Sequence, residues 1–404
     1  MTALHHDILV AGGGIAGLTA AAAFGAAGFS VLCVDPAPPV TEREAEGADL
    51  RTTAFLQPAR ALLERAGLWA RLEAHAMPLQ TMRIMDISGE MERDRTRREF
   101  DSADISDAPF GWNLPNWLLR REMAARLEEM PGVSFRPGVA AETLFTRRGE
   151  ARVRLSDGDE ARVRLVLAAD GRNSPMRRQA GIAARTLRFG QKALAFAVTH
   201  PVPHENVSTE IHLKGGPFTL VPLPDHEGRP SSAVVWMEDG REALRLADLP
   251  VEALEATMTA RSGGLLGPLT LASQVTLWPI ISRVADRFAG ERVALVAEAA
   301  HVVPPIGAQG LNMSLADLAA LLELAEARPE GLGDAEMLAA YDRKRALDVR
   351  MRVAGVSMLN GVSMLGGQPF AALRARGIGA LHDIAPVRRG LMRLGLGAGT
   401  TPGA

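Results

Sequence analysis

Cysteine, aromatic residues and strong net charge are all scarce in this sequence of 404 residues. Cys33 is the single cysteine, which excludes an internal disulfide, a thiolate metal cluster and CxxC redox chemistry, and fits a reducing compartment. Aromatic residues make up 4% of the chain, with one tyrosine, which disfavours a stacking platform for nucleic-acid bases. The formal net charge of -2 gives no overall field that attracts nucleic acid or an anionic membrane.

Long apolar runs are also missing from the sequence. Because no run reaches about 18 apolar residues, we expect no membrane-spanning helix. The N-terminus lacks a basic segment followed by an apolar one, so we expect no signal peptide and a cytoplasmic protein, with peripheral membrane contact as an open possibility. The remaining composition, 47% hydrophobic and 23% charged, is that of a globular chain with two or three domains.

The first 35 residues have the pattern of a βαβ unit. Residues 7–11 are strand-like, residues 15–27 form an alanine-rich helical stretch, and residues 29–34 are strand-like again. The turn between the first strand and the helix matches the GxGxxG fingerprint of dinucleotide-binding folds. The expected contacts of this turn are Gly12, Gly14, Ile15, Ala16 and Gly17. Asp35 ends the second strand, where a carboxylate would accept from ribose hydroxyls. The alternative is a tight glycine turn without a ligand.

In two later segments, a strand is again followed by an acidic residue and then by a turn. A strand-like stretch over residues 163–169 leads into Asp170 and Gly171. A second strand, over residues 292–297, is followed by Glu298 and by a turn at residues 305–310 that opens a helix expected over residues 311–327. Such a turn aims backbone N–H groups at a ligand edge that can carry negative charge, as a reduced flavin ring does.

On these motifs the chain resembles the FAD-dependent aromatic hydroxylases of the para-hydroxybenzoate hydroxylase type. The segment at residues 305–312, Pro-Ile-Gly-Ala-Gln-Gly-Leu-Asn, is similar to the UbiH/UbiF branch, which hydroxylates ubiquinone precursors. The resemblance covers essentially the whole chain. It implies FAD as the cofactor and NAD(P)H as a transient co-substrate. Arg51 resembles the family arginine near the flavin, and Arg120 resembles the one near the FAD diphosphate and ribityl chain.

The late motif supplies further expected cofactor contacts, and it departs from the family pattern at two positions. These contacts are Pro305, Gly307, Gly310, Leu311 and Asn312, in addition to Asp170 and Glu298. Where the family has Gly-Asp, this chain has Ala297-Glu298, and Ala308 replaces the first glycine of the usual Gly-Gln-Gly. If residue 308 requires a positive φ, alanine is strained there.

Each of these side chains also has a purely structural interpretation. Asp170 is also suited to capping the turn after its strand, or to a nicotinamide contact. Arg51 and Arg120 are alternatively surface ion pairs. For His301 we favour a packed, hydrogen-bonded turn residue over an acid–base catalyst. No metal-binding spacing and no catalytic side chain is identified in the sequence.

The expected fold class is α/β, with a Rossmann-like FAD-binding domain and an inserted antiparallel-sheet substrate domain. The FAD-binding domain is expected over residues 1–76, 106–182 and 276–345, the sheet domain over residues 77–105 and 183–275, and a helical C-terminal region over residues 346–404. The substrate pocket is expected between the two domains. Apolar residues of the sheet either face the pocket or form an ordinary core: Phe189, Phe196, Phe218, Leu220, Val221 and Trp236.

The resemblance implies a monooxygenase that hydroxylates a polyprenylated phenol in ubiquinone biosynthesis. In the family, NAD(P)H reduces FAD, and O2 then gives a flavin C4a-hydroperoxide whose distal oxygen is attacked by the phenol ring. Two alternatives stay open. One is a hydroxylase of the same fold that acts on a soluble aromatic metabolite, and the other is a non-catalytic subunit of a biosynthetic complex.

The C-terminal region is rich in methionine and arginine. Its apolar and basic residues are Met351, Val353, Met358, Leu359, Met364 and Leu365, then Arg374, Arg376, Arg388, Arg389 and Arg393. Such a segment is suited to a membrane surface or to a partner in a ubiquinone-synthesis complex. The alternative is that it packs against the FAD-binding domain.

Overall fold

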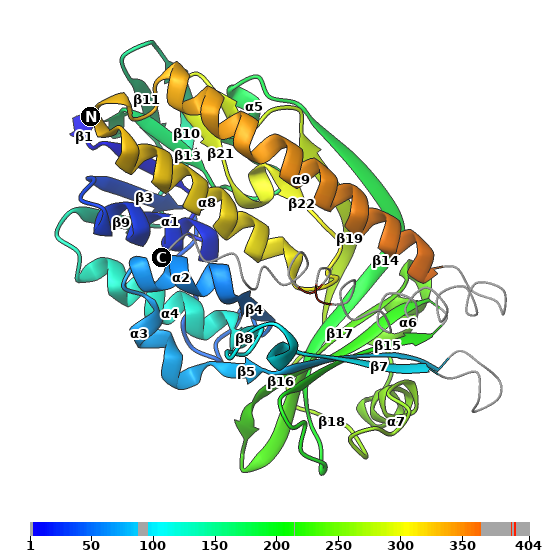
Figure 1. The fold of residues 1–404 in the computed structure, drawn as a ribbon. Helices are drawn as coiled ribbons and strands as arrows, with labels where there is room; N and C mark the ends of the chain where they lie inside the picture. The colour runs from blue at the N-terminus through cyan, green and yellow to red at the C-terminus, as the bar shows by residue number, and fades with distance from the viewer. Residues whose placement is uncertain (1–2, 88–95, 214, 365–388, 390–391, 393–404) are drawn as a thin grey trace.

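The structure is a computed structural model that describes residues 3–87, 96–213, 215–364, 389 and 392. Figure 1 shows a sheet flanked by helices at the N-terminal end of the molecule and a large, strongly twisted and mostly antiparallel sheet at the other end. Among the described residues, no helix is both long enough and apolar enough to cross a membrane.

The first sheet has six strands and is mostly parallel. Its order is β20 (Ala289–Gly290), β21 (Val293–Leu295), β13 (Leu165–Ala168), β2 (Ile8–Ala11), β3 (Val31–Asp35) and β9 (Val133–Pro137). All neighbours from β21 to β9 pair in parallel, and β20 is the antiparallel edge strand. Every residue of β2 and β13 is buried, as expected for strands covered by other elements on both faces of a parallel sheet.

Helices pack on this sheet, and an alanine-rich helix lies buried at the centre of the helical layer. The central helix α1 (Ile15–Ala26) contacts α2 (Gln57–Arg65), α4 (Asn116–Glu128) and α8 (Gln309–Ala327). Nine consecutive residues of α1, from Ala16 to Phe24, are buried, because small alanine side chains let neighbouring helices approach closely. Shorter helices complete the layer: α3 (Trp69–Leu72), η1 (Glu73–His75), η4 (Ala297–Ala299), η5 (Pro329–Gly331) and α5 (Pro175–Gln179).

The second large sheet has nine strands. Its path is β22 (His301–Val302), β19 (Thr276–Ala285), β14 (Ala184–Thr199), β17 (Arg229–Asp239), β16 (Gly216–His226), β15 (Val207–Leu213), β6 (Thr81–Asp86) and β7 (Thr96–Asp101), with β18 (Thr270–Leu271) pairing on β14. Helices α6 (Gly240–Ala247) and α7 (Val251–Arg261) bury apolar side chains in one core with this sheet. Its other face turns towards the six-stranded sheet and its helices.

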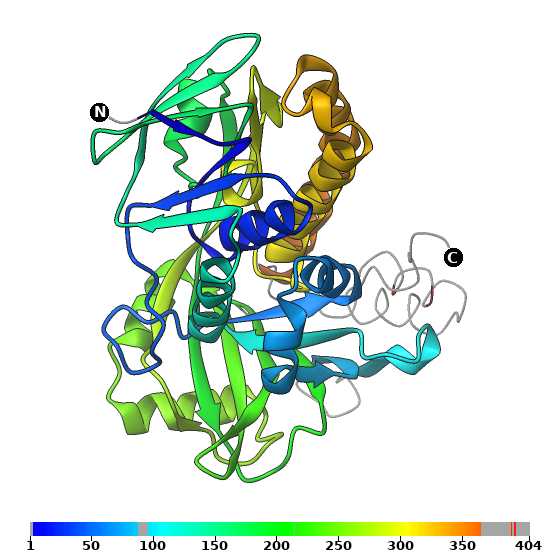
Figure 2. The same cartoon turned by 90° about the vertical axis from the view of Figure 1, so that its left-hand side faces the viewer.

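Two smaller sheets pack against these parts: the first shares the core of the six-stranded sheet, and the second contacts the helices on that sheet and β16 of the nine-stranded sheet. One has the order β1 (Ala3–His5), β12 (Glu160–Val163), β11 (Ala151–Leu155) and β10 (Ala141–Thr146), and the other the order β4 (Thr52–Leu56), β8 (Gly111–Pro115) and β5 (Met77–Leu79). A short η3 (Ser102–Asp104) follows β7. The long α9 (Ala335–Met364) lies beside α8 along one flank of the molecule (Figures 1 and 2).

The sequence patterns over residues 7–35, 163–169 and 311–327 predicted elements that the structure contains with shifts of a few residues. One expected boundary differs. Residues 276–285, which the sequence analysis assigns to the FAD-binding domain, form β19 and pair with β14 of the nine-stranded sheet. The alternation of apolar residues in this stretch is compatible with either sheet, so the sequence did not place it. Residues 365–388 and Arg393 lie outside the described residues.

Candidate active site

Four loops that carry predicted site residues leave the six-stranded sheet at one edge. The register pairs Ala11 with Ala168 and with Val34, and Ala168 with Leu295, so the four parallel strands end at one level. Because the carboxyl ends of parallel strands share an edge, the glycine turn, Asp35, Asp170 and the segment containing Glu298 emerge side by side. The predicted residues of four separate segments therefore line one edge of the sheet, the edge at which open α/β sheets hold their ligands; it is called the crevice below.

The glycine turn has the geometry that its fingerprint requires. Gly12 has a φ of 109°, and a Cβ atom there would lie 2.4 Å from the carbonyl oxygen of Ala169. A Cβ on Gly17 would lie 1.8 Å from the carbonyl oxygen of Gly12, so glycine is needed for the helix to pack against the turn. A Cβ on Gly14 would meet no atom within 4 Å. The tight fit at two glycines is explained by packing, whereas the open space beside Gly14 is available to a ligand.

Helix α1 begins directly behind this open space. Ile15 and Ala16 form its first turn, where backbone N–H groups have no acceptor within the helix. The Asp35 carboxylate accepts hydrogen bonds from Gly13 N at 2.6 Å and from Ala37 N at 2.8 Å. Asp35 thus ties the glycine turn to the end of β3, and a carboxylate with about four acceptor positions still has lone pairs for ribose hydroxyls.

Arg51 and Arg120 meet at a buried carboxylate that the sequence analysis did not single out, Asp49. Arg51 binds it through Nε and Nη2, both at 2.7 Å, and Arg120 Nη2 lies 3.7 Å away. Burial alone would raise the pKa of Asp49, but the hydrogen bonds from Arg51 and Asn116 and the charge of Arg120 outweigh it, so its pKa is lowered. Asp49 is therefore ionised near neutral pH and fixes both arginines at the crevice.

Arg51 and Arg120 differ in the contacts that they make besides Asp49. The Arg51 guanidinium lies 4.0 Å from the ring centroid of Trp278 on β19, so it bridges to the nine-stranded sheet. The Nε atom of Arg120 is buried and has no hydrogen-bond partner in the structure. An unpaired buried donor is costly, which makes this atom a candidate for a contact with a bound ligand.

Asp170 and Glu298 lie in quite different surroundings. Asp170 Oδ2 accepts from Met176 N at 2.9 Å, whereas its Oδ1 atom is buried and unpartnered. Burial raises the pKa of Asp170 despite the hydrogen bonds that favour its charged form. Glu298 is 48% exposed at its side chain and forms a 3.3 Å ion pair with Arg172, which follows the Asp170-Gly171 turn. That ion pair joins the two acidic turns to each other.

Both alanines that replace family glycines have left-handed backbone conformations. Ala297 and Ala308 each have a φ of 55°, and Gly307, immediately before Ala308, has a φ of 63°. The strain foreseen at residue 308 is therefore present, and a second strained alanine lies at residue 297. A left-handed conformation costs an L-residue roughly 1–2 kcal/mol, so the surrounding hydrogen bonds must hold both turns in place.

The turn at residues 305–312 is exposed at its tip and anchored at its base. Pro305, Ala308 and Gly310 are exposed, and a Cβ on Gly310 would meet no atom within 4 Å. Leu311 packs against the main core. The backbone of the turn is therefore accessible at the start of α8, as the backbone at Gly14 is at the start of α1.

Asn312 provides the anchor of this turn. Its Oδ1 accepts from Leu56 N at 2.9 Å, and its Nδ2 donates to the carbonyl oxygens of Ala54 at 2.8 Å and Ala308 at 2.7 Å. Its side chain thus joins the turn to β4, a strand more than 250 residues earlier in the chain. All its polar atoms serve this clamp, so the structure gives it a positioning role.

A buried ionic network lies beneath the turn, and His301 is the member of it that the sequence had singled out. Asp317 is fully buried; its Oδ2 lies 2.7 Å from His301 Nε2, and its Oδ1 accepts from Arg345 Nε at 2.8 Å. His301 is 1% exposed at its side chain, which confirms the interpretation of a packed, hydrogen-bonded residue. Asp317 Oδ2 also accepts from Ala297 N at 3.3 Å, so the network reaches one strained alanine directly.

The apolar residues proposed for the substrate wall divide between the two faces of the nine-stranded sheet. Phe196, Phe218, Leu220 and Trp236 are buried in the core with α6 and α7, so for these four the alternative of an ordinary sheet core is correct. Phe189 lies on the other face, in a cluster with Ala193, Met237, Ile280 and Ile306 of the 305–312 turn. Val221 also faces that side, where it packs with Leu56, Leu79 and Phe110. Strand alternation separates the two sets.

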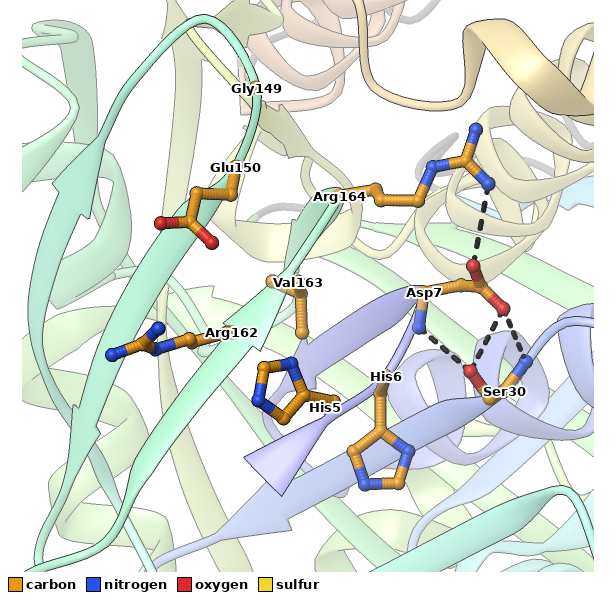
Figure 3. A pocket seen from close by; sticks show the side chains of 9 residues that line it. All are labelled: His5, His6, Asp7, Ser30, Gly149, Glu150, Arg162, Val163 and Arg164. Carbon is orange, nitrogen blue, oxygen red and sulfur yellow. Dashed lines mark hydrogen bonds and ion pairs between the residues drawn. The ribbon is translucent and has the colours of Figure 1, made fainter. Parts of the chain in front are cut away.

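A polar hollow lies at the opposite edge of the six-stranded sheet (Figure 3). It measures about 390 Å³ and is lined by His5, His6, Asp7, Ser30, Gly149, Glu150, Arg162, Val163 and Arg164. Asp7 accepts from Ser30 N and Oγ and pairs with Arg164 at 3.4 Å, as Figure 3 shows. Because β2, β3 and β13 begin here, this hollow is remote from the crevice edge where the glycine turn lies. It is a surface hollow that does not belong to the candidate site.

The crevice fits a long ligand that carries phosphate and a planar ring. Two buried polar atoms without partners, Arg120 Nε and Asp170 Oδ1, lie on segments that meet at the crevice edge. Two glycines, Gly14 and Gly310, leave open space at two helix N-termini, which attract anionic groups. These features match the diphosphate and the ring of FAD.

Comparison with known proteins agrees with this geometry. The family model described as "FAD binding domain" matches residues 5–354. The chain is 32% identical over 97% of its length to the ubiquinone hydroxylase UbiL of Rhodospirillum rubrum, of which 89% is covered. It is 25% identical over 98% of its length to the 3-demethoxyubiquinol 3-hydroxylase of Escherichia coli, covered completely.

Solved structures with the same fold include p-nitrophenol 4-monooxygenase PnpA of Pseudomonas putida. That structure has a TM-score of 0.79 at 19% identity and covers 99% of this chain and 100% of the other. PqsL of P. aeruginosa, in complex with 2-aminobenzoylacetate, has a TM-score of 0.75 at 23% identity, with 93% and 100% covered. These matches confirm the expected α/β fold class of the para-hydroxybenzoate hydroxylase type. The chain therefore belongs to the FAD binding domain family and is an FAD-dependent hydroxylase of that family.

Proposed function

We propose that this chain hydroxylates the ring of a polyprenylated phenol in ubiquinone biosynthesis, with NAD(P)H and O2 as co-substrates. The observation that carries the proposal is the 32% identity to a ubiquinone hydroxylase over 97% of the chain. The apolar cluster of Phe189, Ala193, Met237, Ile280 and Ile306 beside the 305–312 turn supports it, because an apolar substrate gains free energy on leaving water for such a wall. FAD, when bound, supplies the redox and oxygen-transfer chemistry.

The proposed contacts to FAD follow from the geometry of the crevice. Gly14 and the first turn of α1 at Ile15 and Ala16 hold the diphosphate, and Asp35 accepts from a ribose hydroxyl. Arg120 Nε donates to the diphosphate or the ribityl chain, and Asp170 Oδ1 accepts from a hydroxyl or amide of the cofactor. Both contacts satisfy a buried atom that otherwise has no partner.

The flavin ring is proposed to lie against the 305–312 turn. Gly307, Ala308 and Gly310 present backbone there, and Pro305 and Leu311 flank it. Asn312 keeps the turn on β4, so its role is to position the ring rather than to react. Glu298, through its ion pair with Arg172, and Arg51, over the ring of Trp278, are further proposed contacts of the cofactor. The ordered, partly apolar walls exclude water from the reacting ring, and the proton acceptor for the phenol is not assigned to a side chain.

We also propose a division of the chain that follows the sheets. The FAD-binding part comprises residues 1–76, 106–182 and 286–345, and the substrate part comprises residues 77–105 and 183–285. A peripheral position at a membrane, or contact with a ubiquinone-synthesis complex, fits a substrate with a long prenyl tail. The C-terminal region from residue 346 onwards is the proposed contact.

The experiment is mass spectrometry of quinone intermediates in a strain that lacks this chain. We expect an under-hydroxylated quinone precursor to accumulate, and expression of the wild-type chain to restore the normal profile. A Gly14→Ala chain, designed to bind FAD weakly, serves as the control and should restore less. A normal quinone profile in the deletion strain would reject the pathway. In that case, tight binding of small benzoates without binding of prenylated phenols would indicate a soluble aromatic substrate.

A further inference from the structure

Helix α9 has apolar residues on two opposite faces of its C-terminal half. The inner set, buried against the rest of the protein, is Val349, Val353, Val356 and Asn360. The outer set, offset by two positions, is Leu347, Met351, Ala354 and Met358, with Leu359 beside it. Both sets follow the spacing i, i+4, i+7 and i+11, so each forms a continuous stripe along the helix. The large side chains of the outer face are 65%, 60%, 69% and 54% exposed at Leu347, Met351, Met358 and Leu359.

The inner face fixes the orientation of the helix. Ser357 Oγ lies 2.7 Å from Ser282 Oγ on β19, and the buried Asn360 donates to Gln191 on β14 at 2.9 Å. Arg352 donates to Gln309 at the start of α8 at 3.2 Å. These contacts leave α9 no freedom to rotate its outer face inwards. Within the part of the chain that the structure describes, the outer face is therefore molecular surface, along which α9 runs in Figure 1.

Exposed large apolar side chains are concentrated on this helix. Of the nine such residues in the described part of the chain, four lie on the outer face of α9. The others are scattered singly over different elements: Phe145, Leu187, Val202, Leu244 and Val251. Single exposed apolar residues are common, whereas a contiguous exposed stripe indicates a binding surface.

The charge beside the stripe indicates what it binds. Residues 343–352 contain five basic residues and one acidic residue, although the whole chain has a net charge of -2. Three of the five basic residues are paired with carboxylates: Lys344 with Glu323, and Arg345 and Arg352 with Asp348. The exposed Arg343 and Arg350 form no ion pair within the described residues, and Arg350 donates to the backbone carbonyl of Asp286. Both lie three or four residues from Leu347, on the outer face, and an outward apolar stripe flanked by arginines is the pattern of a helix that lies in the interface of an anionic bilayer.

We propose that the outer face of α9, formed by Leu347, Met351, Ala354, Met358 and Leu359, docks on the surface of an anionic lipid bilayer. Because a helix is about 10 Å across, docking places the bilayer surface roughly one helix diameter from the turn that Arg352 contacts. This deepens the proposed function, on which it rests for its purpose: a prenylated phenol dissolved in the bilayer would be delivered beside the crevice.

The test uses the full chain with bound FAD and vesicles of phosphatidylcholine, with or without phosphatidylglycerol, in a sedimentation assay. The variant is the double substitution Met351→Glu and Met358→Glu, and the matched control is Leu244→Glu on α6, where the leucine is 46% exposed. We expect wild type and control to bind the vesicles that contain phosphatidylglycerol. Binding of the double variant should fall at least about tenfold, and Met351→Leu with Met358→Leu should restore it.

Equal binding by the double variant, or no vesicle binding by the wild type, would overturn the proposal. A wild-type dimer that the double variant dissociates, without vesicle binding, would also overturn it and assign the face to a second copy of the chain. An unchanged thermal midpoint and FAD content show that the variant is folded. Hydroxylation of a water-soluble, short-chain phenol should persist in it, and if no phenol is hydroxylated by wild type, the proposed function fails while the vesicle result still stands.

Discussion

Two glycines of the same turn should respond in opposite ways to the same added methyl group. At Gly14 the backbone has φ −71° and ψ 177°, which alanine adopts freely, and the new Cβ meets no atom within 4 Å. The free energy of unfolding of the apoprotein should therefore change by no more than about 0.5–1 kcal/mol. At Gly17 the new Cβ lies 1.8 Å from the Gly12 carbonyl oxygen, so the helix must move away from the turn. Overpacking of this kind costs at least about 1–3 kcal/mol.

The affinity for FAD should instead fall in Gly14→Ala, the variant whose stability is almost unchanged. If the diphosphate lies against Gly14, the methyl group in Gly14→Ala displaces it from one or two backbone N–H groups. A hydrogen bond to a charged group contributes about 1.5–3 kcal/mol, so the loss of one bond weakens binding by roughly 10- to 100-fold. The measurements are thermal melting of both apoproteins and titration of each with FAD, followed by flavin fluorescence.

Wild-type affinity for FAD in a stable Gly14→Ala protein would refute this reasoning, because the open space would then not be where the diphosphate lies. Equal destabilisation of the two apoproteins would refute the packing difference between the two glycines. Either result would remove the main geometric support for the cofactor contacts proposed at the glycine turn.

Three further substitutions test the turns and their supports. Ala308→Gly removes a left-handed alanine, so the free energy of unfolding in urea should rise by up to about 1 kcal/mol after the entropy of glycine is subtracted. Asp317→Ala removes one of the two carboxylates that pair with Arg345, which keeps Asp348, and leaves the buried His301 Nε2 without its partner, so differential scanning calorimetry should show a loss of about 1–3 kcal/mol. Burial raises the folded-state pKa of Asp170, so the free energy of unfolding of the wild-type protein falls as the pH rises above the unfolded value of 3.8. Asp170→Asn lacks this dependence. In urea melts of the apoproteins, the stability of Asp170→Asn relative to wild type should therefore increase between pH 4 and 7.

For each of these three substitutions, a different result would contradict the explanation given. Reduced stability of Ala308→Gly would mean that the left-handed backbone carries no net strain. A small effect of Asp317→Ala would mean that Arg345 finds water or another acceptor when its partner is lost. A constant difference between Asp170→Asn and wild type at both pH values would mean that the carboxyl group has the same pKa in the folded and unfolded chains.

The local features of the first βαβ unit were predictable because they depend on short sequence spacing. A glycine with a φ of 109° and a helix start three residues later follow from backbone sterics at Gly12 to Gly17. The strain at Ala308 was foreseeable for the same reason, since a family glycine at a turn indicates a positive φ. The matching strain at Ala297 was not foreseen, although the same substitution of a glycine marks it.

Interactions between distant segments were not predictable from periodicity. Nothing in the sequence around Asn312 indicates that its amide pairs with the backbone of β4, and Asp49 has no motif that links it to Arg51 and Arg120. The faces of the nine-stranded sheet were equally hidden. Apolar side chains of this sheet are buried on both of its faces, so the sequence does not show that Phe189 and Phe196 lie on opposite faces. In α9, two opposite apolar faces likewise cancel the amphipathic signal.

The most direct test of the central claim is the fate of molecular oxygen in a single assay. Purified wild-type chain with FAD, NAD(P)H and a prenylated phenol is incubated under oxygen-18 gas, and the phenol is analysed by mass spectrometry. We expect substrate-stimulated NAD(P)H oxidation and one oxygen-18 atom on the ring of the product. NAD(P)H oxidation that leaves the phenol unlabelled, or a protein that takes up no flavin, would contradict the account.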